Sequence, residues 1–293
     1  YGLGYEQLKS EFPRLIYCSV TGFGQTGPYA ARPGYDGLIQ AMGGVMSLTG
    51  VPDGEPMKVA VPICDLMAGM YATVGILAAV RHQAETGEGQ FIDIGMLDTH
   101  IGWLANQGMN YLATGENPDR IGNMHPNILP YQVMPTSDGY IVLSVGNDPT
   151  FERFCKLAEC EHLLEDERFQ TNAARVSNRD HVTSVLNEIT NKKPSAWWLE
   201  ELEREKIGCG PINNLDQVFD DPHVKAREMV VEMEHPAMGT KPMKLIANPI
   251  KLSKTPPTYR KAPPMLGQHT EDILKEAGLS ENEIAKLKDD GTV

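Results

Sequence analysis

Apolar and polar positions alternate with two different spacings along the first 115 residues. Residues 6–12 predict a short helix before Pro13, and the mostly apolar run RLIYCSVTGFG (14–24) predicts a buried strand. We expect helices at 36–48 and 63–83, a strand at 90–96 and a helix at about 99–113. The last helix places its apolar residues on one face, namely Ile101, Leu104, Ala105, Gly108, Met109 and Leu112. Alternating helices and strands predict a large Rossmann-like α/β domain over 1–115.

The pattern changes after residue 115. Residues 116–130 are rich in Gly, Asn and Pro and are interpreted as a linker or lid loop. The segment YQVMPTSDGYIVLSVG predicts a hairpin with its turn at Asp138-Gly139, and 149–206 is helical and more charged. We therefore expect a smaller α+β domain over 131–228. Residues 229–293, with returning strands and two short helices at 270–289, are expected to rejoin the large domain.

Composition narrows the function classes. The 293 residues are 41% hydrophobic and carry a formal net charge of −13, which argues against nucleic acid as a partner. The five cysteines are odd in number and form no CxxC pair, so we expect free thiols in a reducing compartment. The longest apolar run, 66–80, is interrupted by Gly69 and Gly75 and is interpreted as a buried helix, not a membrane span.

The chain opens on Tyr1 and enters at once into a helix–strand unit. We therefore expect that an N-terminal segment is missing, and that any targeting sequence would be missing with it.

The stretch GEGQFIDIGMLDTH (87–100) places Asp98 where a strand gives way to a helix. Aspartate is a favoured N-cap, because its side chain accepts a hydrogen bond from a free backbone N–H. A carboxylate at a helix start also stays ionised and can project into a crevice at a strand end, where α/β folds bind ligands. Spacing alone leaves both interpretations open.

Other candidates have the same ambiguity. Asp65 opens the apolar helix and is either its cap or an acid/base group; Tyr35-Asp36 is either a cap beside a buried phenol or part of a site. His125, in GNMHPN (122–127), is either a structural hydrogen-bonding residue or part of a lid. GFGQTG has no following Lys and lacks the order of a phosphate loop. The dispersed His and Cys residues predict no metal site, and no GxSxG motif occurs.

Several longer segments together resemble the class III CoA-transferases (CaiB/BaiF type), a family that also includes α-methylacyl-CoA racemases. The likeness covers nearly the whole chain and is nearest to the succinyl-CoA–glutarate branch, through LPYQ, GPINN and MEHP. The segments that carry it are SVTGFGQTGPYAARPGYDGLIQAMGG (19–44), DLMAGMYATVGILAAVRHQAETGEGQFIDIGMLD (65–98), GNMHPNILPYQVMPTSDGYIVLSVGN (122–147), GPINNLDQVFDDPHV (210–224), VVEMEHPAMG (230–239) and APPMLGQHTEDIL (262–274).

This resemblance implies that Asp98 is a nucleophile that attacks an acyl-CoA thioester. A mixed anhydride and then an aspartyl-CoA thioester would follow, and a carboxylic acid acceptor would reverse the sequence. CoA thioester is then a substrate, no cofactor is expected to be permanently bound, and succinyl-CoA with a dicarboxylic acceptor is the expected pair. The residues expected to bind CoA or substrate are Tyr35, Asp36, Asp65, Gly122, Asn123, His125 and Asn127.

The resemblance also implies the class III CoA-transferase fold, an interlocked homodimer, and a cytoplasmic location, or a mitochondrial one in a eukaryote. Two departures stand out. The family's early segment, with several CoA contacts, has no counterpart here, and GNMHPN replaces the Gly-rich lid of the formyl-CoA enzymes. Arg32 and Arg120 are candidates, by charge only, to bind the acid's distal carboxylate.

Two alternative functions remain open. A racemase needs a base and an acid on opposite faces of the α-carbon; the corresponding positions here are Tyr35 and Asp65, and tyrosine is a poor general base at neutral pH. The second alternative is a truncated family member without catalytic activity, against which the presence of Asp98 within its motif argues.

Overall fold

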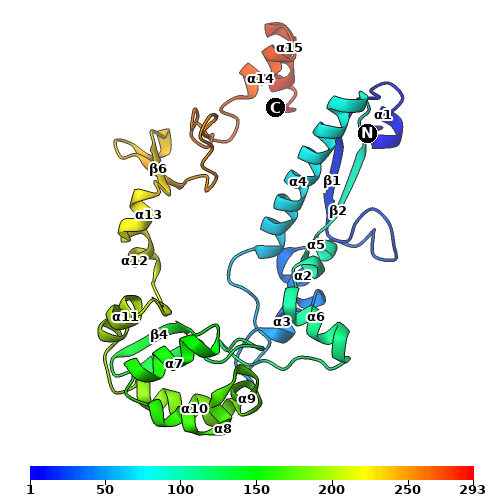
Figure 1. Cartoon of the computed structure of the whole chain (residues 1–293). Helices are drawn as coiled ribbons and strands as arrows, with labels where there is room; N and C mark the ends of the chain where they lie inside the picture. The colour runs from blue at the N-terminus through cyan, green and yellow to red at the C-terminus, as the bar shows by residue number, and fades with distance from the viewer. The chain divides into compact units, whose positions relative to one another are not determined.

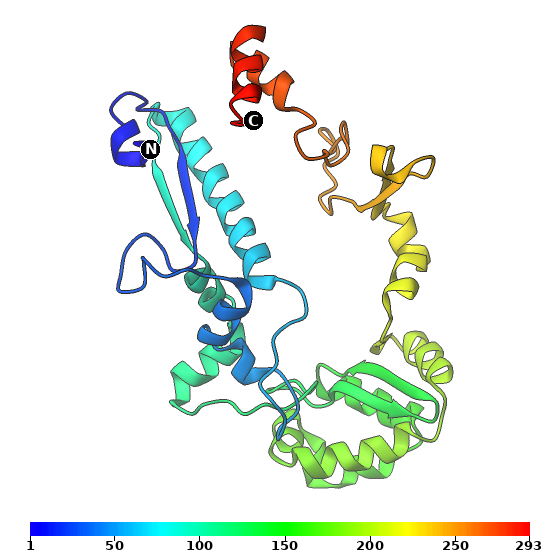
Figure 2. The same cartoon turned by 180° about the vertical axis from the view of Figure 1, so that it is seen from behind.

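The computed structural model describes residues 1–293, which form two compact units, Tyr1–Pro211 and Ile212–Val293 (Figures 1 and 2). The boundary falls earlier than the expected end of the small domain at residue 228. The expected return of residues 229–293 to the large domain stays a prediction.

The first part of the larger unit is built around two parallel strands. β1 (Tyr17–Thr21) pairs with β2 (Phe91–Gly95) in a register that runs from Tyr17↔Phe91 to Thr21↔Gly95. A parallel pair requires a long crossover, and helices form most of it here. Because the strands end at the same level, the loop after Thr21 and the helix after Gly95 start side by side. This common end is the position that the sequence predicted for Asp98.

The helices of this part agree with the sequence in place but differ in continuity. They are α1 (Tyr5–Leu8), α2 (Asp36–Met42), α3 (Val45–Leu48), α4 (Ile63–Thr86), α5 (Met96–Gly102) and α6 (Ala105–Thr114). The single helix expected at 36–48 is divided because Gly44 adopts φ 94°, which is left-handed backbone. The helix expected at 99–113 begins earlier, at Met96, and is interrupted at Trp103 and Leu104.

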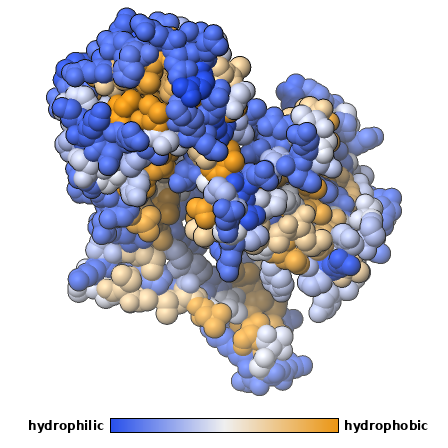
Figure 3. All heavy atoms as spheres, turned by 90° about the horizontal axis from the view of Figure 1, so that it is seen from below, coloured by the Kyte–Doolittle hydropathy of each residue, from blue (hydrophilic) through white to orange (hydrophobic).

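α4 lies along β1 and β2 (Figures 1 and 2) and buries only a narrow stripe, namely Cys64, Ala68, Ala72 and Ala79. Its other faces carry exposed apolar side chains, among them Leu66, Met70, Val74 and Leu77. The interpretation of this run as a buried helix is therefore wrong for most of its surface. By length and composition alone α4 could cross a membrane, but that is weak evidence, because core helices pass the same test. On the face in Figure 3, apolar patches likewise interrupt the hydrophilic surface.

The second part of the larger unit is a small α+β layer. Its antiparallel sheet has the order β3-β4-β5, with β3 at Tyr131–Thr136, β4 at Gly139–Ser144 and β5 at Gly208–Pro211. The predicted hairpin is confirmed, although Thr136 pairs with Gly139, so the loop is Ser137-Asp138. The helical segments are α7 (Asp148–Leu157), η1 (Glu161–Glu165), α8 (Glu167–Gln170), α9 (Asn172–Ser177), α10 (Arg179–Thr190) and α11 (Ser195–Arg204).

A buried arginine connects three segments of this layer by hydrogen bonds. The Arg175 guanidinium donates to the carbonyl oxygens of Leu129 and Phe169, each at 2.7 Å, and to Oδ1 of Asp148 at 2.8 Å. It also lies 4.3 Å from the ring centre of Phe151. A buried charge is tolerated when its hydrogen bonds are satisfied in this way.

The smaller unit contains short elements only. They are α12 (Leu215–Asp220), α13 (Pro222–Ala226), β6 (Val230–Met233), η2 (Pro236–Met238), β7 (Met243–Ile246), α14 (Thr270–Glu276) and α15 (Glu281–Asp289). The predicted strands form an antiparallel pair with each other, from Val230↔Ile246 to Met233↔Met243. The two predicted C-terminal helices are confirmed.

Candidate active site

Asp98 is the third residue of α5, directly after β2, and its side chain is exposed. The N-cap position of this helix belongs to Gly95, which has extended backbone and no capping side chain. The interpretation of Asp98 as a helix cap is therefore wrong. The structure presents an exposed carboxylate at the end of the strand pair.

Glycines make room for this carboxylate. A Cβ atom on Gly95 would lie 2.8 Å from Oδ2 of Asp98 and 3.0 Å from the amide nitrogen of Gly24. The Asp98 side chain thus folds back over the end of β2, next to the turn that follows β1. Any larger residue at position 95 would displace the carboxylate or the turn, because real Cβ contacts do not come so close.

The turn after β1 is fixed by hydrogen bonds to both strands and to α5. The Leu97 N–H donates to the carbonyl oxygen of Gly22 at 3.0 Å, and the Gly24 N–H donates to Oγ1 of Thr21 at 2.9 Å. The Gln25 N–H donates to the Asp93 carboxylate, 2.9 Å from Oδ2. Two amides of GFGQTG are therefore used within the protein, which agrees with rejecting it as a phosphate loop.

Asp93 was missed by the sequence analysis. It lies in the middle of β2, and its carboxylate reaches the Gln25 amide 68 positions away. A charged residue inside a short strand was the available signal. Only the pairing of β1 with β2 shows which backbone group it holds.

Asp36 links α2 to α4. Its Oδ1 accepts from the Cys64 N–H at 2.8 Å, and its Oδ2 accepts from Nε2 of Gln40 at 2.7 Å. Asp36, the first residue of α2, therefore accepts a hydrogen bond from one of the free amides at the start of α4. Tyr35 is 75% exposed, so the interpretation as a buried phenol is wrong. Asp65 is the exposed third residue of α4, whose N-cap is Pro62, so Asp65 is not the cap.

A second buried contact joins α4 to the helix of Asp98. Cys64 and His100 are both fully buried, and Sγ lies 3.2 Å from Nδ1. Burial, followed by the nearby Asp36 charge, raises the pKa of the Cys64 thiol to about 12. Burial lowers the pKa of His100, against the opposing effect of Asp36. The pair is therefore a neutral thiol beside a neutral imidazole. His100 was also missed, because nothing in its sequence context distinguishes it.

The segment interpreted as a lid is fastened at several points. The carbonyl oxygen of Asn127 accepts from Nδ2 of Asn172 at 2.8 Å, and that of Pro126 accepts from Nη2 of Arg179 at 2.8 Å. Oδ1 of Asn127 lies 3.3 Å from the Asn110 amide on α6. These contacts join the segment to α6, α9 and α10.

Three more of the expected residues lie in the same segment. The His125 ring stacks on Tyr131 with centroids 5.3 Å apart, and burial followed by Arg179 lowers the pKa of His125. The Gly122 N–H donates to the carbonyl oxygen of Gly50 at 3.0 Å, and Asn123 is exposed. The hydrogen bonds of the segment do not reach Asp98. Its role at the mouth of the pocket stays a prediction.

The two candidate arginines differ in what their side chains contact. Arg120 donates to the carbonyl oxygens of Val51, Pro52 and Gly54, the last at 2.7 Å, so its guanidinium holds a loop of the protein. Arg32 is exposed, with its guanidinium carbon 4.0 Å from the ring centre of Tyr29. Of the two, Arg32 stays the candidate for an acid's distal carboxylate.

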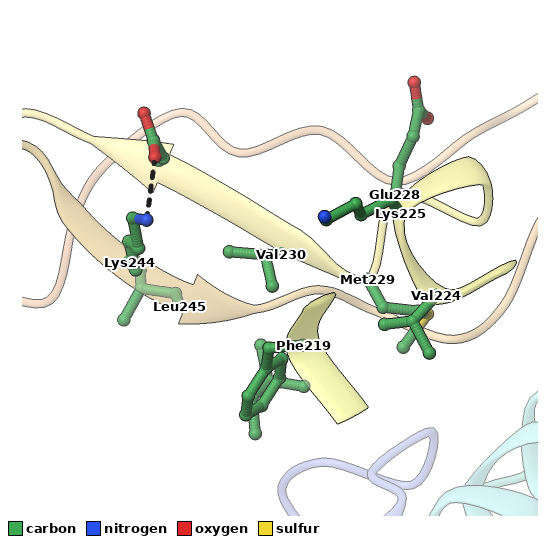
Figure 4. Close-up of a pocket in the computed structure, with 10 residues that line it drawn as sticks. Phe219, Val224, Lys225, Glu228, Met229, Val230, Lys244 and Leu245 are labelled. Atoms are coloured by element: carbon green, nitrogen blue, oxygen red, sulfur yellow. Dashed lines mark ion pairs between the residues drawn. The ribbon is translucent and has the colours of Figure 1, made fainter. Parts of the chain in front are cut away.

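The smaller unit contains a cavity of about 560 Å³. Phe219, Val224 and Met229 are among its apolar lining residues (Figure 4), and Lys244 pairs with Glu232 at 3.7 Å. None of the site residues expected from the sequence lines it. No group of three or more His, Cys, Asp and Glu side chains in residues 1–293 is arranged to hold a metal ion.

The family model and the similar proteins all indicate the same family. The model of CoA-transferase family III matches residues 1–270. A succinate–glutarate CoA-transferase of Agrobacterium fabrum is 45% identical over 276 residues, covering 94% of this chain and 68% of the relative. The human succinyl-CoA:glutarate CoA-transferase is 38% identical, covering 94% of this chain and 62% of the relative. The chain thus spans about two thirds of the length of these relatives.

Solved structures agree with the fold. A CAIB/BAIF family protein from Brucella suis has a TM-score of 0.78 and 45% identity, covering 94% of this chain and 71% of that one. Rv3272 from Mycobacterium tuberculosis has a TM-score of 0.81 and 27% identity, covering 92% of this chain and 72% of that one. The expected class III CoA-transferase fold is confirmed.

Proposed function

The chain belongs to CoA-transferase family III, and we propose that it moves CoA from succinyl-CoA to a dicarboxylic acid through Asp98. The observation that carries this proposal is the exposed Asp98 carboxylate at the common end of β1 and β2, beside the fixed turn at Gly24. The names of the relatives support succinyl-CoA as donor and a dicarboxylate as acceptor.

The chemistry requires four displacements at carbonyl carbon. An Asp98 oxygen attacks the succinyl thioester, which forms a mixed anhydride and releases CoA thiolate. The thiolate attacks the Asp98 carbonyl carbon, which forms an aspartyl-CoA thioester and releases succinate. The acceptor carboxylate attacks this thioester and releases the thiolate again. The thiolate then attacks the acceptor's acyl carbon, which yields the new acyl-CoA and restores the carboxylate.

Asp98 suits this role because a carboxylate is charged at neutral pH and needs no separate base. Its side chain is exposed, and the lack of a side chain at Gly95 leaves the space in which the carboxylate lies. We include the interlocked homodimer in the proposal, and light scattering of the purified protein tests it by molar mass.

Racemisation has less support. Its two positions in this chain are Tyr35, whose phenol is 75% exposed, and Asp65, which is also exposed. An exposed phenol is a poor base at neutral pH. No contact in the structure activates either group for proton abstraction.

The test is a product analysis in D₂O. We would incubate the protein with succinyl-CoA, a 2-methylacyl-CoA and a panel of carboxylic acids, and identify the acyl-CoA products by mass spectrometry. A new acyl-CoA names the acceptor. Asp98→Ala should lower its rate of formation by at least about a thousandfold, because the covalent route is lost.

Asp272→Asn is the matched control, because Asp272 is the exposed third residue of another seven-residue helix, α14. It should retain the parental rate. Deuterium at the α-carbon without acyl exchange would instead support racemisation. Full transfer activity in Asp98→Ala would remove Asp98 from the mechanism.

A further inference from the structure

We propose that the buried contact between Cys64 and His100 is a positioning device that holds the helix of Asp98 in place for reaction. Neither residue is proposed to touch the substrate. The inference rests on the proposed function of Asp98 and adds two residues that act through it.

The geometry connects the pair directly to the nucleophile. His100 lies two residues after Asp98 in α5, which is only seven residues long. Two positions apart on a helix correspond to nearly opposite faces. Accordingly, Asp98 is exposed whereas His100 is fully buried against α4. The 3.2 Å contact between Nδ1 and Sγ of Cys64 joins the inner face of α5 to the start of α4.

The protons of this contact follow from burial. Burial keeps the Cys64 thiol protonated and keeps the His100 imidazole neutral. The hydrogen bond between Sγ and Nδ1 therefore joins two neutral groups, and its direction depends on the tautomer of His100, because the Asp36 carboxylate is a second acceptor for the thiol proton. Nε2 is buried without a hydrogen-bond partner. A phenylalanine would fill similar space without an unpaired ring nitrogen, so what histidine adds here is the contact at Nδ1.

Other groups pack closely around both partners. A Cβ atom on Gly43 would lie 2.0 Å from Cδ2 of His100, so the ring packs directly on the α2 backbone. Trp103 meets the ring edge-on, with centroids 5.1 Å apart. On the other side, Asp36 holds the Cys64 amide. A displacement of α5 would thus have to break the thiol–imidazole contact.

The contact should matter for function because the reaction rate depends on the distance between the Asp98 carboxylate and the thioester. Effective covalent catalysis depends on reacting atoms held in near-attack geometry, and small misplacements from distant changes cost large factors in rate. Loss of the contact should therefore affect the chemical steps while the affinity for acyl-CoA is kept. This effect distinguishes positioning from binding.

The test compares Cys64→Ala, which removes the hydrogen-bonding partner of Nδ1, with Cys64→Ser, which keeps a hydroxyl able to donate or accept in the same place. Cys18→Ala, in β1, controls for loss of a thiol elsewhere. In the transfer assay we expect Cys64→Ala to lower kcat by about tenfold or more with KM for succinyl-CoA unchanged. Cys64→Ser should recover most of the rate, and Cys18→Ala should equal the parent.

Hydrogen exchange read by mass spectrometry gives a second measurement that needs no activity. The peptide covering 96–102 should exchange faster in Cys64→Ala than in the parent, and Cys64→Ser should return it toward the parent. Unchanged exchange in Cys64→Ala, or a serine variant as impaired as alanine in both measurements, would overturn the proposal. A parent that transfers no CoA would contradict the proposed function alone, because the exchange measurement still decides the positioning role.

Discussion

The two parts of the larger unit use their apolar residues very differently. The layer from Leu129 to Ile207 buries sixteen hydrophobic residues in one core, including Trp198 and three phenylalanines. The part around β1 and β2, which contains Asp98, buries a cluster of five, namely Phe23, Ile39, Cys64, Ala68 and Met96. The small layer encloses its own core, whereas the part that contains Asp98 leaves much of its most apolar helix exposed.

This difference shows what holds each part together. In the small layer, packing of large side chains supplies most of the stability. Around Asp98, contacts are instead specific and polar: Asp36 with Cys64, Cys64 with His100, and Asp93 with Gln25. Such contacts fix backbone positions but bury little apolar area. The site is thus defined by its hydrogen bonds more than by its core.

The largest effect should come from the core of the small layer. Trp198 is fully buried, stacks on Phe154 with centroids 6.0 Å apart, and donates from Nε1 to the carbonyl oxygen of Thr190 at 2.7 Å. We expect Trp198→Ala to lower the free energy of unfolding by about 3–5 kcal/mol. Urea unfolding followed by circular dichroism measures it. A loss below about 1 kcal/mol would show that this layer does not depend on its own core.

A smaller effect is expected in the part that contains Asp98. Asp36→Ala removes the acceptor for the Cys64 amide and for Gln40, and should cost about 1–2 kcal/mol of unfolding free energy. Asp65→Ala is the control, because Asp65 lies in the first turn of the same helix, α4. It should change the free energy of unfolding by less than about 0.5 kcal/mol. Equal losses in the two variants would contradict the hydrogen-bonding role of Asp36.

The pH dependence should also differ between the parts. Because the folded pKa of His100 lies below its unfolded value near 6.5, its contribution to stability is complete above that value. It is lost as pH falls through the folded pKa, because the unfolded chain then binds the additional proton. The free energy of unfolding should therefore fall below pH 6.5, by up to about 1.4 kcal/mol per pH unit for one histidine.

His100→Phe should flatten this slope when urea unfolding is repeated between pH 5 and 7. His125, whose pKa is also lowered, has the same sign and a more exposed ring, so His125→Phe should flatten the slope less. A slope unchanged in His100→Phe would show that this imidazole is not kept neutral by the fold.

The smallest effect is expected on the outer face of α4. Leu77 is 64% exposed, so Leu77→Ala should change the free energy of unfolding by less than about 0.5 kcal/mol. Ala79→Leu, on the buried stripe of the same helix, should cost about 1–3 kcal/mol through overpacking. A large loss in Leu77→Ala would mean that this face is covered in solution, which would narrow the difference between the two parts.

The sequence by itself determined the local elements. The β2 strand, the apolar α4 helix, the β3–β4 hairpin and the two C-terminal helices follow from periodicity and turn residues, because both depend on near neighbours. Motif likeness predicted Asp98 as the reactive carboxylate, which spacing alone did not separate from a helix cap.

The tertiary structure decided how distant residues meet. Asp93 and Gln25 are 68 positions apart, and Cys64 and His100 are 36 apart, so no local pattern pairs them. It also decided that Gly95, not Asp98, is the N-cap of α5, and that α4 buries only an alanine-rich stripe. These outcomes depend on which surfaces pack together, and packing between separated segments is not encoded in periodicity.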